Sequence, residues 1–321
     1  MFELQQSDEQ VALAEALRRL AQRSVRGPMA HGGVPPAGGL AAAWAALHQM
    51  GLCAPVGADR PDPMTAMLIA EEVGFGDPGL AYQLVCRARA AAMIADLGTG
   101  EQRSAWLPRL AADPGCLASV GYFEGFGRSP LELRTSARRV GDGWRLSGTK
   151  IGVVLPAGGG PLVLVAREEQ TGEPVAFVLT REFGVRRDDA AVGKLGLDAA
   201  ATGDIELTEV PVPESARLAG TGASVLAAVA ALRLEVTAVL LGTARAALAY
   251  AAEYANGREA FGQPIAGYQG VAFPLVDVDI ELDAARLLVW RASAEVADVA
   301  EVAQAAEFGR AARLVAEAVA R

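Results

Sequence analysis

The sequence predicts an α+β protein in which a small β domain follows one helical domain along the chain and precedes another. Apolar residues recur at helical spacing near both ends of the chain, where alanine, the strongest helix former, is abundant. Between about Cys116 and Pro213 the pattern changes to short alternating runs separated by turn residues, which is typical of strands. We therefore expect an N-terminal α-helical domain over 1–115, a middle β domain over 116–220 and a C-terminal helical bundle over 221–321.

The N-terminal region predicts a series of helices. Ser7 and Gln10 have the spacing of a capping box and precede an amphipathic run, Val11–Arg23. Gly27–Gly39 is rich in glycine and proline and predicts a loop. The segment Gly74–Gly79 matches G-x-G-x-x-G, but it follows a helical pattern instead of a strand, so we interpret it as a turn between helices. Further helical patterns cover Leu40–Met50, Met64–Val73, Leu80–Leu97 and Glu101–Ala112.

The middle region predicts strands joined by tight turns. Gly141-Asp-Gly143 separates two alternating runs, Leu131–Val140 and Trp144–Ser147, which indicates a hairpin. The prolines at Pro211 and Pro213 are expected to end the strand region. The other expected strands are Ile151–Leu155, Leu162–Ala166, Val175–Thr180, Val185–Arg187 and Asp204–Glu209.

The C-terminal region predicts long helices. The first runs from Val225 to Asn256, and Gly257 is suited to stop it. Its most apolar stretch contains Arg233 and Glu235, which favours a buried core helix over a membrane span. A short turn rich in proline and glycine follows, and the remaining expected helices are Tyr268–Ala297 and Val299–Ala320.

Composition excludes several classes of function. The 321 residues are 52% apolar, enough for a large core, and the net charge of −9 disfavours nucleic acid and anionic membranes as partners. Two histidines and three cysteines without metal-site spacing argue against a metal centre and against Ser/His/Asp or Cys/His catalysis. The odd cysteine count fits a reducing cytoplasm. Any redox chemistry would therefore use carboxylates and a bound cofactor.

One motif in the C-terminal region points to a family. Arg258-x-x-Phe261-Gly262, a glutamine eleven residues after the arginine and the later Ala-Ala-Arg-Leu pattern resemble the C-terminal domain of the acyl-CoA dehydrogenases. The resemblance extends along nearly the whole chain, through a hairpin ending in Gly148-Thr-Lys150 and a strand over Glu206–Pro213. It implies FAD as the cofactor, an acyl-CoA substrate, and contacts from Arg258, Phe261 and Gln269 to the FAD of a neighbouring subunit.

The chain departs from this family where the catalytic base is expected. The resemblance implies a glutamate either after the last helix, where this chain stops at Arg321, or just before Arg233, where this chain has Leu232. Glu235 lies three residues further along and is a low-weight candidate for a relocated base. Its ordinary interpretation is a carboxylate that pairs with Arg233 or lies at the helix surface.

The residues expected against the flavin ring are also altered. The resemblance implies Thr-Glu and then a serine at the end of the first strand, and this chain has Phe123-Glu124 and Ser129. Glutamate and serine are retained, so Ser129 is expected to contact FAD. The resemblance further implies Trp-x-Thr after the lysine, and this chain has Gly152 and Val154 there. These replacements offer neither a stacking face nor a hydroxyl.

The sequence therefore favours a shortened subunit of a heteromeric acyl-CoA dehydrogenase. A homologous partner would carry the ring pocket and the base, in an α2β2 assembly resembling those of actinobacterial steroid and sterol side-chain degradation. Two alternatives stay open. One is a self-sufficient enzyme that uses Glu235 or Glu124 as a relocated base, and the other is a non-enzymatic scaffold with the same fold.

Overall fold

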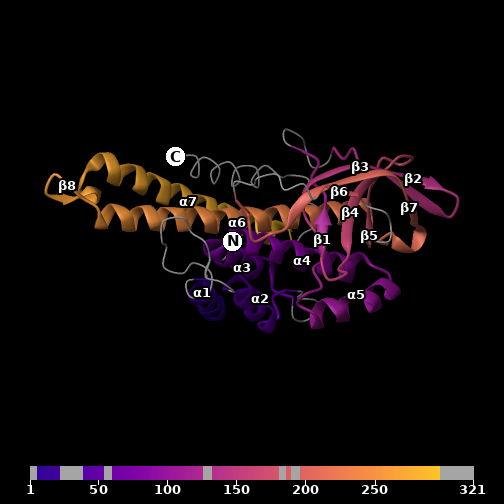
Figure 1. Cartoon of the computed structure of the whole chain (residues 1–321), viewed down its shortest axis with the longest axis horizontal. Helices are drawn as coiled ribbons and strands as arrows, with labels where there is room; N and C mark the ends of the chain where they lie inside the picture. Colours follow the sequence, from indigo (N-terminus) through magenta and orange to yellow (C-terminus); the bar gives the residue numbers. More distant parts are fainter. Residues whose placement is uncertain are drawn as a thin grey trace. The chain divides into compact units, whose positions relative to one another are not determined.

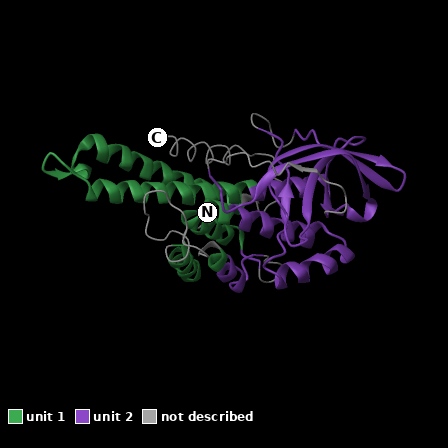
Figure 2. Ribbon diagram, in the orientation of Figure 1, with its two compact units in different colours: residues 1–43, 62–81, 233–321 green, residues 44–61, 82–232 purple. Residues whose placement is uncertain are grey.

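The computed structural model describes residues 6–21, 39–53, 60–125, 132–180, 186–188 and 196–296. Helices come first, then one large sheet, then two long helices, which confirms the α+β class and the predicted order (Figure 1). The contacts divide the chain into two compact units (Figure 2). Each unit combines segments that are distant in the sequence, so the three predicted domain boundaries stay predictions. Unit 1 contains Met1–Ala43, Asp62–Ala81 and Arg233–Arg321, and unit 2 contains Trp44–Pro61 and Tyr82–Leu232.

The N-terminal helices begin at local signals that the sequence carries. The predicted capping box of α1 is confirmed, because the Ser7 hydroxyl accepts from the Gln10 amide N–H and the Gln10 side chain accepts from the Ser7 N–H. The predicted loop Gly27–Gly39 falls outside the described residues except for Gly39, which already belongs to a helix. These helices are α1 (Asp8–Leu20), α2 (Gly39–Gln49), α3 (Pro63–Gly76), α4 (Pro78–Leu97) and α5 (Gly100–Ala112).

The glycine-rich segment after α3 is a link between helices, as predicted. Asp77 interrupts the helical hydrogen bonding, and its backbone N–H still donates to the Val73 carbonyl at 3.0 Å. Its carboxylate accepts from the Leu80 N–H at 2.7 Å and so caps the first turn of α4. Helix α3, and not a strand, leads into this segment, so it lacks the strand–turn–helix geometry of a dinucleotide-binding loop.

Two long helices follow the sheet. α6 (Gly222–Gly257) and α7 (Gln269–Val296) match the predicted helices to within a few residues, and the predicted helix Val299–Ala320 falls outside the described residues. α7 folds back alongside α6 (Figure 1), and Leu241, Ala244, Leu282 and Ala285 form a buried cluster between them. By length and hydropathy α6 is the one described helix that could cross a membrane, although 61% of its most apolar window is buried, as in a core helix.

A buried ionic network joins the helices of unit 1. Glu71 and Glu72 on α3 are 2% and 3% exposed. Arg18 on α1 holds Glu72 with two hydrogen bonds of 3.0 and 2.6 Å, and Arg286 on α7 donates to Glu71 at 2.8 and 3.0 Å. Arg245 on α6 contacts both carboxylates. Three cations thus compensate two buried anions, which is the condition for keeping such charges inside a helical core.

Two glycines let α3 and α6 approach closely within unit 1. A Cβ atom on Gly242 of α6 would overlap the carbonyl oxygen of Glu71 and lie 2.8 Å from the Phe75 nitrogen. A Cβ on Gly74 of α3 would lie 2.6 Å from the Val239 carbonyl oxygen. Both neighbours are backbone atoms of helices, so neither can move aside without shifting a whole turn.

We expect Gly242→Ala to lower the stability of the chain. The overlap costs about 1–3 kcal/mol, and a gain of up to about 1 kcal/mol in helix propensity offsets part of it. The melting temperature followed by circular dichroism should fall. Gly270→Ala is the matched control, because a Cβ there meets nothing within 4 Å. Equal melting temperatures for the two variants would contradict the close-packing explanation.

The strands of unit 2 form one seven-stranded sheet in the order β1-β4-β2-β3-β7-β6, and β5 also pairs with β4. The predicted hairpin is confirmed: β2 and β3 pair antiparallel and turn through Gly141, whose φ of +62° suits glycine. The strands are β1 (Ser119–Gly121), β2 (Ser136–Val140), β3 (Gly143–Val154), β4 (Leu162–Glu168), β5 (Pro174–Leu179), β6 (Arg186–Asp188) and β7 (Thr202–Pro213).

One prediction about the strands is wrong. The runs Trp144–Ser147 and Ile151–Leu155 belong to one continuous strand, β3, which changes register twice against β7. The prediction that the strand region ends at Pro211 and Pro213 is confirmed, because β7 passes through Pro211 and finishes at Pro213. The prolines are tolerated there because β6 pairs with β7 only at Asp204–Glu206, so the other edge of β7 needs no N–H donor further along.

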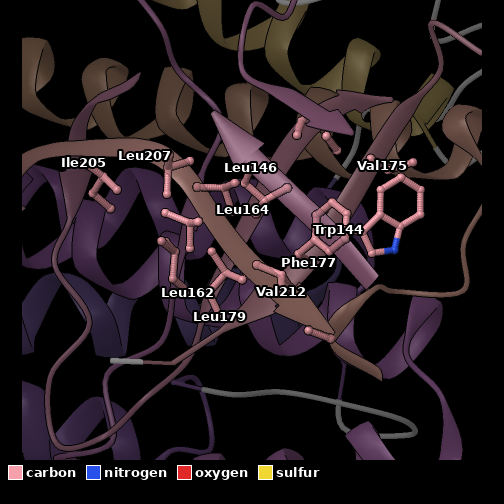
Figure 3. Packing of buried hydrophobic residues seen from close by; sticks show 14 of the residues in the cluster. Trp144, Leu146, Leu162, Leu164, Val175, Phe177, Leu179, Ile205, Leu207 and Val212 are labelled. Atoms are coloured by element: carbon pink, nitrogen blue, oxygen red, sulfur yellow. The ribbon is translucent and has the colours of Figure 1, made fainter. Parts of the chain in front are cut away.

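The core of the sheet is built from alternate residues of its long strands. Trp144 and Phe177 meet edge to face with ring centroids 5.6 Å apart (Figure 3). The Trp144 indole N–H donates to the Glu214 carboxylate at 2.6 Å, so its one polar atom is satisfied. Aliphatic side chains fill the rest of the core, among them Leu146, Leu162, Leu164, Leu179, Ile205, Leu207 and Val212.

Candidate functional site

The connection between α6 and α7 is a small ordered hairpin. β8 (Glu259–Ala260) pairs with β9 (Gln263–Pro264), a short stretch that was predicted only as a turn. Phe261 and Gly262 form the two-residue loop with φ values of +53° and +86°. A positive φ is ordinary for glycine and strained for phenylalanine. Such strain at an exposed position is a feature from which function can be inferred.

Backbone bonds and one ring contact hold this hairpin in place. The Arg258 N–H donates to the Tyr254 carbonyl, and the Arg258 carbonyl accepts from the Ile265 N–H, both at 2.8 Å. The Tyr268 hydroxyl donates to the Ala260 carbonyl at 2.9 Å, and its ring lies 6.5 Å from that of Phe261. α7 begins at the next residue, Gln269. The hairpin is therefore fixed by its own main chain, which leaves its polar side chains available.

The structure brings the three predicted cofactor residues of the C-terminal region into this one connection. The side chains of Arg258 and Gln269 are exposed, and Phe261 is 99% exposed. Within the described part of the chain, the Arg258 guanidinium forms no ion pair with Glu253 or Glu259, and no hydrogen bond of the Gln269 side chain is seen. The α6 C-terminus is capped by the Arg258 backbone instead of its side chain. An exposed guanidinium, amide and phenyl ring are suited to an anionic aromatic ligand held outside this unit.

The other two predicted site residues do not join them. Ser129 lies outside the described residues. Glu235 lies on α6 with 6% of its surface exposed, so the interpretation of this residue as a surface carboxylate is wrong. It is packed within the helical core because the segment around it is apolar on more than one face.

The carboxylate of Glu124, the alternative base, makes structural contacts. Its Oε1 atom lies 2.6 Å from the Lys150 Nζ and also accepts from the Thr135 N–H at 3.0 Å. Its Oε2 atom accepts from the Arg134 N–H at 2.6 Å. The pair is buried, with side-chain exposures of 0% for Lys150 and 8% for Glu124. Both oxygens are thus engaged, and this carboxylate joins the end of β1 to the segment before β2 and to β3.

Burial also lowers the pKa of Lys150. Desolvation lowers the pKa of Lys150 to about 8, and the nearby Glu124 charge and its hydrogen bond oppose that shift. Sequence reasoning did not identify this pair, although the Gly-x-Lys element that carries Lys150 was a visible signal. Lysine is almost never fully buried without a charged partner, so the burial of Lys150 in β3 implies one.

The positions expected to face a flavin ring offer little to bind one. Gly152 has a φ of +63° at a register shift of β3, and a Cβ there would meet nothing within 4 Å. Its N–H donates to the Asp204 carboxylate at 2.9 Å, and its carbonyl accepts from the Tyr82 hydroxyl at 3.2 Å. Val154 is buried, and Phe123 packs its ring 6.4 Å from that of Tyr122. No hydroxyl or indole is present at these positions.

The cysteines and acidic residues form no metal site or nucleophilic site in the described part of the chain. Cys53, Cys86 and Cys116 are buried and form no disulfide with one another. Burial raises the pKa of the Cys53 thiol to about 12, which makes it a poor nucleophile. Among the described residues no group of three or more His, Cys, Asp or Glu side chains could hold a metal ion.

Comparisons with known proteins match both helical parts of the chain. The model of the acyl-CoA dehydrogenase N-terminal domain matches residues 7–113, and that of the C-terminal domain matches residues 220–320. The mitochondrial short-chain specific acyl-CoA dehydrogenase of Bos taurus is 32% identical over 212 residues, which cover 62% of this chain and 50% of that protein. Glutaryl-CoA dehydrogenase of Desulfococcus multivorans is 30% identical over 241 residues, 72% of this chain and 61% of that protein.

Solved structures share the fold over nearly the whole chain. A glutaryl-CoA dehydrogenase from Mycobacterium smegmatis, in complex with FADH2, has a TM-score of 0.78 and 23% identity and covers 97% of this chain and 83% of its own. The fold predicted from the sequence is thereby confirmed. The chain spans about half the length of the first curated relatives it matches.

Proposed function

Because the chain belongs to the acyl-CoA dehydrogenase family, we propose that it is a subunit of a heteromeric, FAD-dependent enzyme that desaturates an acyl-CoA thioester. A homologous partner subunit, in an α2β2 assembly, holds the flavin ring and the base. This chain contributes Arg258, Phe261 and Gln269 to the same FAD. The substrate class we propose, a steroid or sterol side-chain CoA ester, rests on the resemblance to short subunits of such unequal pairs. The three buried cysteines form no disulfide, which supports a cytoplasmic setting.

One observation carries the proposal. The side chains expected to serve a neighbour's FAD are exposed on an ordered hairpin, while the positions expected to serve the chain's own flavin ring lack a stacking face and a hydroxyl. A buried flavin heteroatom without a partner costs about 1–3 kcal/mol, so Phe123, Gly152 and Val154 disfavour a ring at that place. The donors of the hairpin fit the phosphates and adenosine of FAD.

Each residue of the hairpin has a distinct task in this proposal. FAD, when bound, supplies the acceptor for the hydride that leaves the substrate β-carbon. Arg258 neutralises and orients the diphosphate through its fork of donors, which lysine cannot reproduce. Gln269 donates a neutral hydrogen bond, and the Phe261 ring offers an apolar face to the adenosine end. None of them touches a reacting atom, so this chain positions the cofactor without taking part in proton transfer.

The experiment that tests the proposal is flavin content with and without the partner. We expect the chain purified alone to carry little or no FAD by absorbance. Flavin should bind when the chain is co-purified with a longer homologous subunit that has its own base. Near-stoichiometric flavin on the isolated chain would support the self-sufficient enzyme instead. No flavin in either preparation would support a scaffold without enzymatic function.

A second prediction concerns Glu235, the candidate for a relocated base. We expect Glu235→Gln to leave the turnover of the assembled enzyme within about tenfold of wild type, because loss of a true general base costs about 10²-fold or more. The variant keeps the size of the buried side chain, so flavin absorbance and melting temperature serve as controls for folding. A loss of 10²-fold or more, with both controls unchanged, would return Glu235 to a catalytic role.

A further inference from the structure

Arg87 on α4 is a fully buried cation whose hydrogen bonding is incomplete. The residue is 0% exposed. Its Nε donates to the Cys116 carbonyl at 3.0 Å, and its Nη2 donates to the carbonyls of Leu110 and Asp113 at 2.6 and 2.9 Å. Its Nη1 is buried and has no hydrogen-bond partner among the residues that the structure describes. A buried donor without an acceptor is unfavourable, and more so when it carries charge, so an acceptor is expected beside Nη1.

The charge of Arg87 is compensated only in part. Arg87 forms no ion pair with a described carboxylate, and Asp113 offers it only a backbone carbonyl, because the Asp113 carboxylate accepts from the Gly115 N–H at 2.8 Å. The Leu110 carbonyl belongs to the last turn of α5, where the helix dipole supplies about half a negative elementary charge. The Trp44 ring, 5.8 Å from the guanidinium carbon, adds a cation–π attraction. These partial charges do not replace a counter-ion.

Two buried thiols lie within the electrostatic reach of this cation. Cys53 and Cys116 are 1% and 0% exposed, and neither thiol forms a hydrogen bond with a described residue. Burial raises the pKa of both thiols, that of Cys53 to about 12, although the Arg87 charge opposes the shift. Both thiols therefore stay protonated near pH 7, where they are weak donors and cannot act as the counter-ion. The unpaired polar groups of this cluster are thus all donors.

We infer that one small monovalent anion of the chloride type binds beside Arg87 and accepts from its Nη1 N–H groups. We call Arg87, Cys53 and Cys116 the Arg87 cluster. One uncompensated cation matches one negative charge, whereas a dianion such as sulfate would leave an excess charge buried. All three residues belong to unit 2, and the inference does not depend on the proposed function.

Two other occupants could fill the same place. A buried water molecule would accept from the N–H groups and leave the charge uncompensated. The carboxylate of Asp59, six positions after Cys53 and outside the described residues, would supply both the acceptor and the charge. The experiment has an outcome for each of them.

The test is urea unfolding of the full chain at increasing chloride, followed by tryptophan fluorescence. Sodium gluconate keeps the ionic strength constant while chloride is raised from about 3 to about 300 mM. Above the dissociation constant of one site, each tenfold rise in chloride should lower the unfolding equilibrium constant about tenfold. Arg87→Gln should abolish this dependence. Arg109→Gln is the matched control and should keep it, because Arg109 is an exposed arginine whose charge also acts on Cys116.

Three results would overturn the inference. An equal chloride dependence in the wild type and in Arg87→Gln would place the ion elsewhere. A wild type that does not respond to chloride would mean that another group occupies the cluster, and Asp59→Asn then identifies that group. A chloride dependence that appears only in Asp59→Asn would assign the place to the Asp59 carboxylate, and its continued absence would assign it to water.

Bromide provides a test that does not require a variant to fold. Crystals of the wild-type chain grown in sodium bromide should show one anomalous-scattering peak within hydrogen-bond distance of the Arg87 Nη1, and the peak should vanish when chloride replaces bromide. Peaks confined to the protein surface would mean an adventitious ion only and would contradict a site at the Arg87 cluster.

Discussion

Arg258→Ala is expected to remove FAD from the assembled enzyme. Truncating one member of a desolvated charge pair costs about 2–5 kcal/mol, so the FAD dissociation constant should rise roughly 30-fold to several-thousand-fold. The reason is that the diphosphate of FAD is a dianion, and a guanidinium gives it two parallel charge-assisted hydrogen bonds. Arg258 has no ion pair among the described residues, so none of their carboxylates competes for it. The measurement is flavin release from the complex, followed by fluorescence during dilution.

Two further variants and one further readout separate this explanation from a purely structural role. Arg258→Lys should recover only part of the affinity, because a point charge lacks the planar fork. Gln269→Ala removes a neutral donor and should cost about 1 kcal/mol, near fivefold. The melting temperature of the flavin-free complex should be unchanged by all three variants. A lower melting temperature with unchanged FAD affinity would mean that Arg258 only stabilises the end of α6.

Lys150→Met is expected to cause the largest loss of stability in unit 2. Removing one member of a buried pair leaves the other charge uncompensated, which costs about 3–5 kcal/mol. Glu124 would keep two backbone N–H donors and lose the Lys150 ammonium, which lies 2.6 Å from its Oε1 atom. Urea unfolding followed by tryptophan fluorescence reports mainly on this unit, because three of the four tryptophans, Trp44, Trp106 and Trp144, lie in it. The unfolding midpoint should fall markedly.

The double variant Lys150→Met/Glu124→Gln is the control for this pair. Neither position then carries a charge, so the urea midpoint of the double variant should lie closer to that of the wild type than the midpoint of Lys150→Met does. pH supplies a second check. The pKa of Lys150 is about 8 in the folded chain and about 10.4 in an unfolded one, so between these values unfolding takes up a proton. The free energy of unfolding of the wild type should therefore rise relative to Lys150→Met as the pH increases from 8 to 10. Parallel pH curves would contradict the buried lysine.

Local signals in the sequence predicted the local features of the fold. The capping box at Ser7, the hairpin turn at Gly141 and the stop of α6 near Gly257 each depend on a few consecutive residues. The ionic network in unit 1 depends on residues 54 to 215 positions apart, so periodicity could not reveal it. The sequence pattern predicted two strands where the structure has the single strand β3. The pattern could not show the continuity, because a register shift is defined by the partner strand.

The candidate site was predictable in part. Arg258, Phe261 and Gln269 were identified from the resemblance to the acyl-CoA dehydrogenases, and they lie in one connection because they are close in the sequence. Their exposure was not predictable, since it depends on how α6 and α7 pack. Glu124 was considered as a base because a carboxylate in a sequence carries no sign of its partners. Lys150 and two backbone N–H groups give it a structural role.

The backbone conformation at Gly152 disfavours a tryptophan at this position. A tryptophan there would have to adopt a φ near +63°, at a cost of roughly 1–2 kcal/mol for a residue with a side chain. A return to ordinary strand geometry would break the bonds to Asp204 and Tyr82 before any ring could be gained. A Gly152→Trp substitution is thus unfavourable in itself, because the backbone cost is incurred whether or not the new ring contacts flavin. Under the proposed function, the backbone at Gly152 therefore favours a flavin ring that is held by another chain.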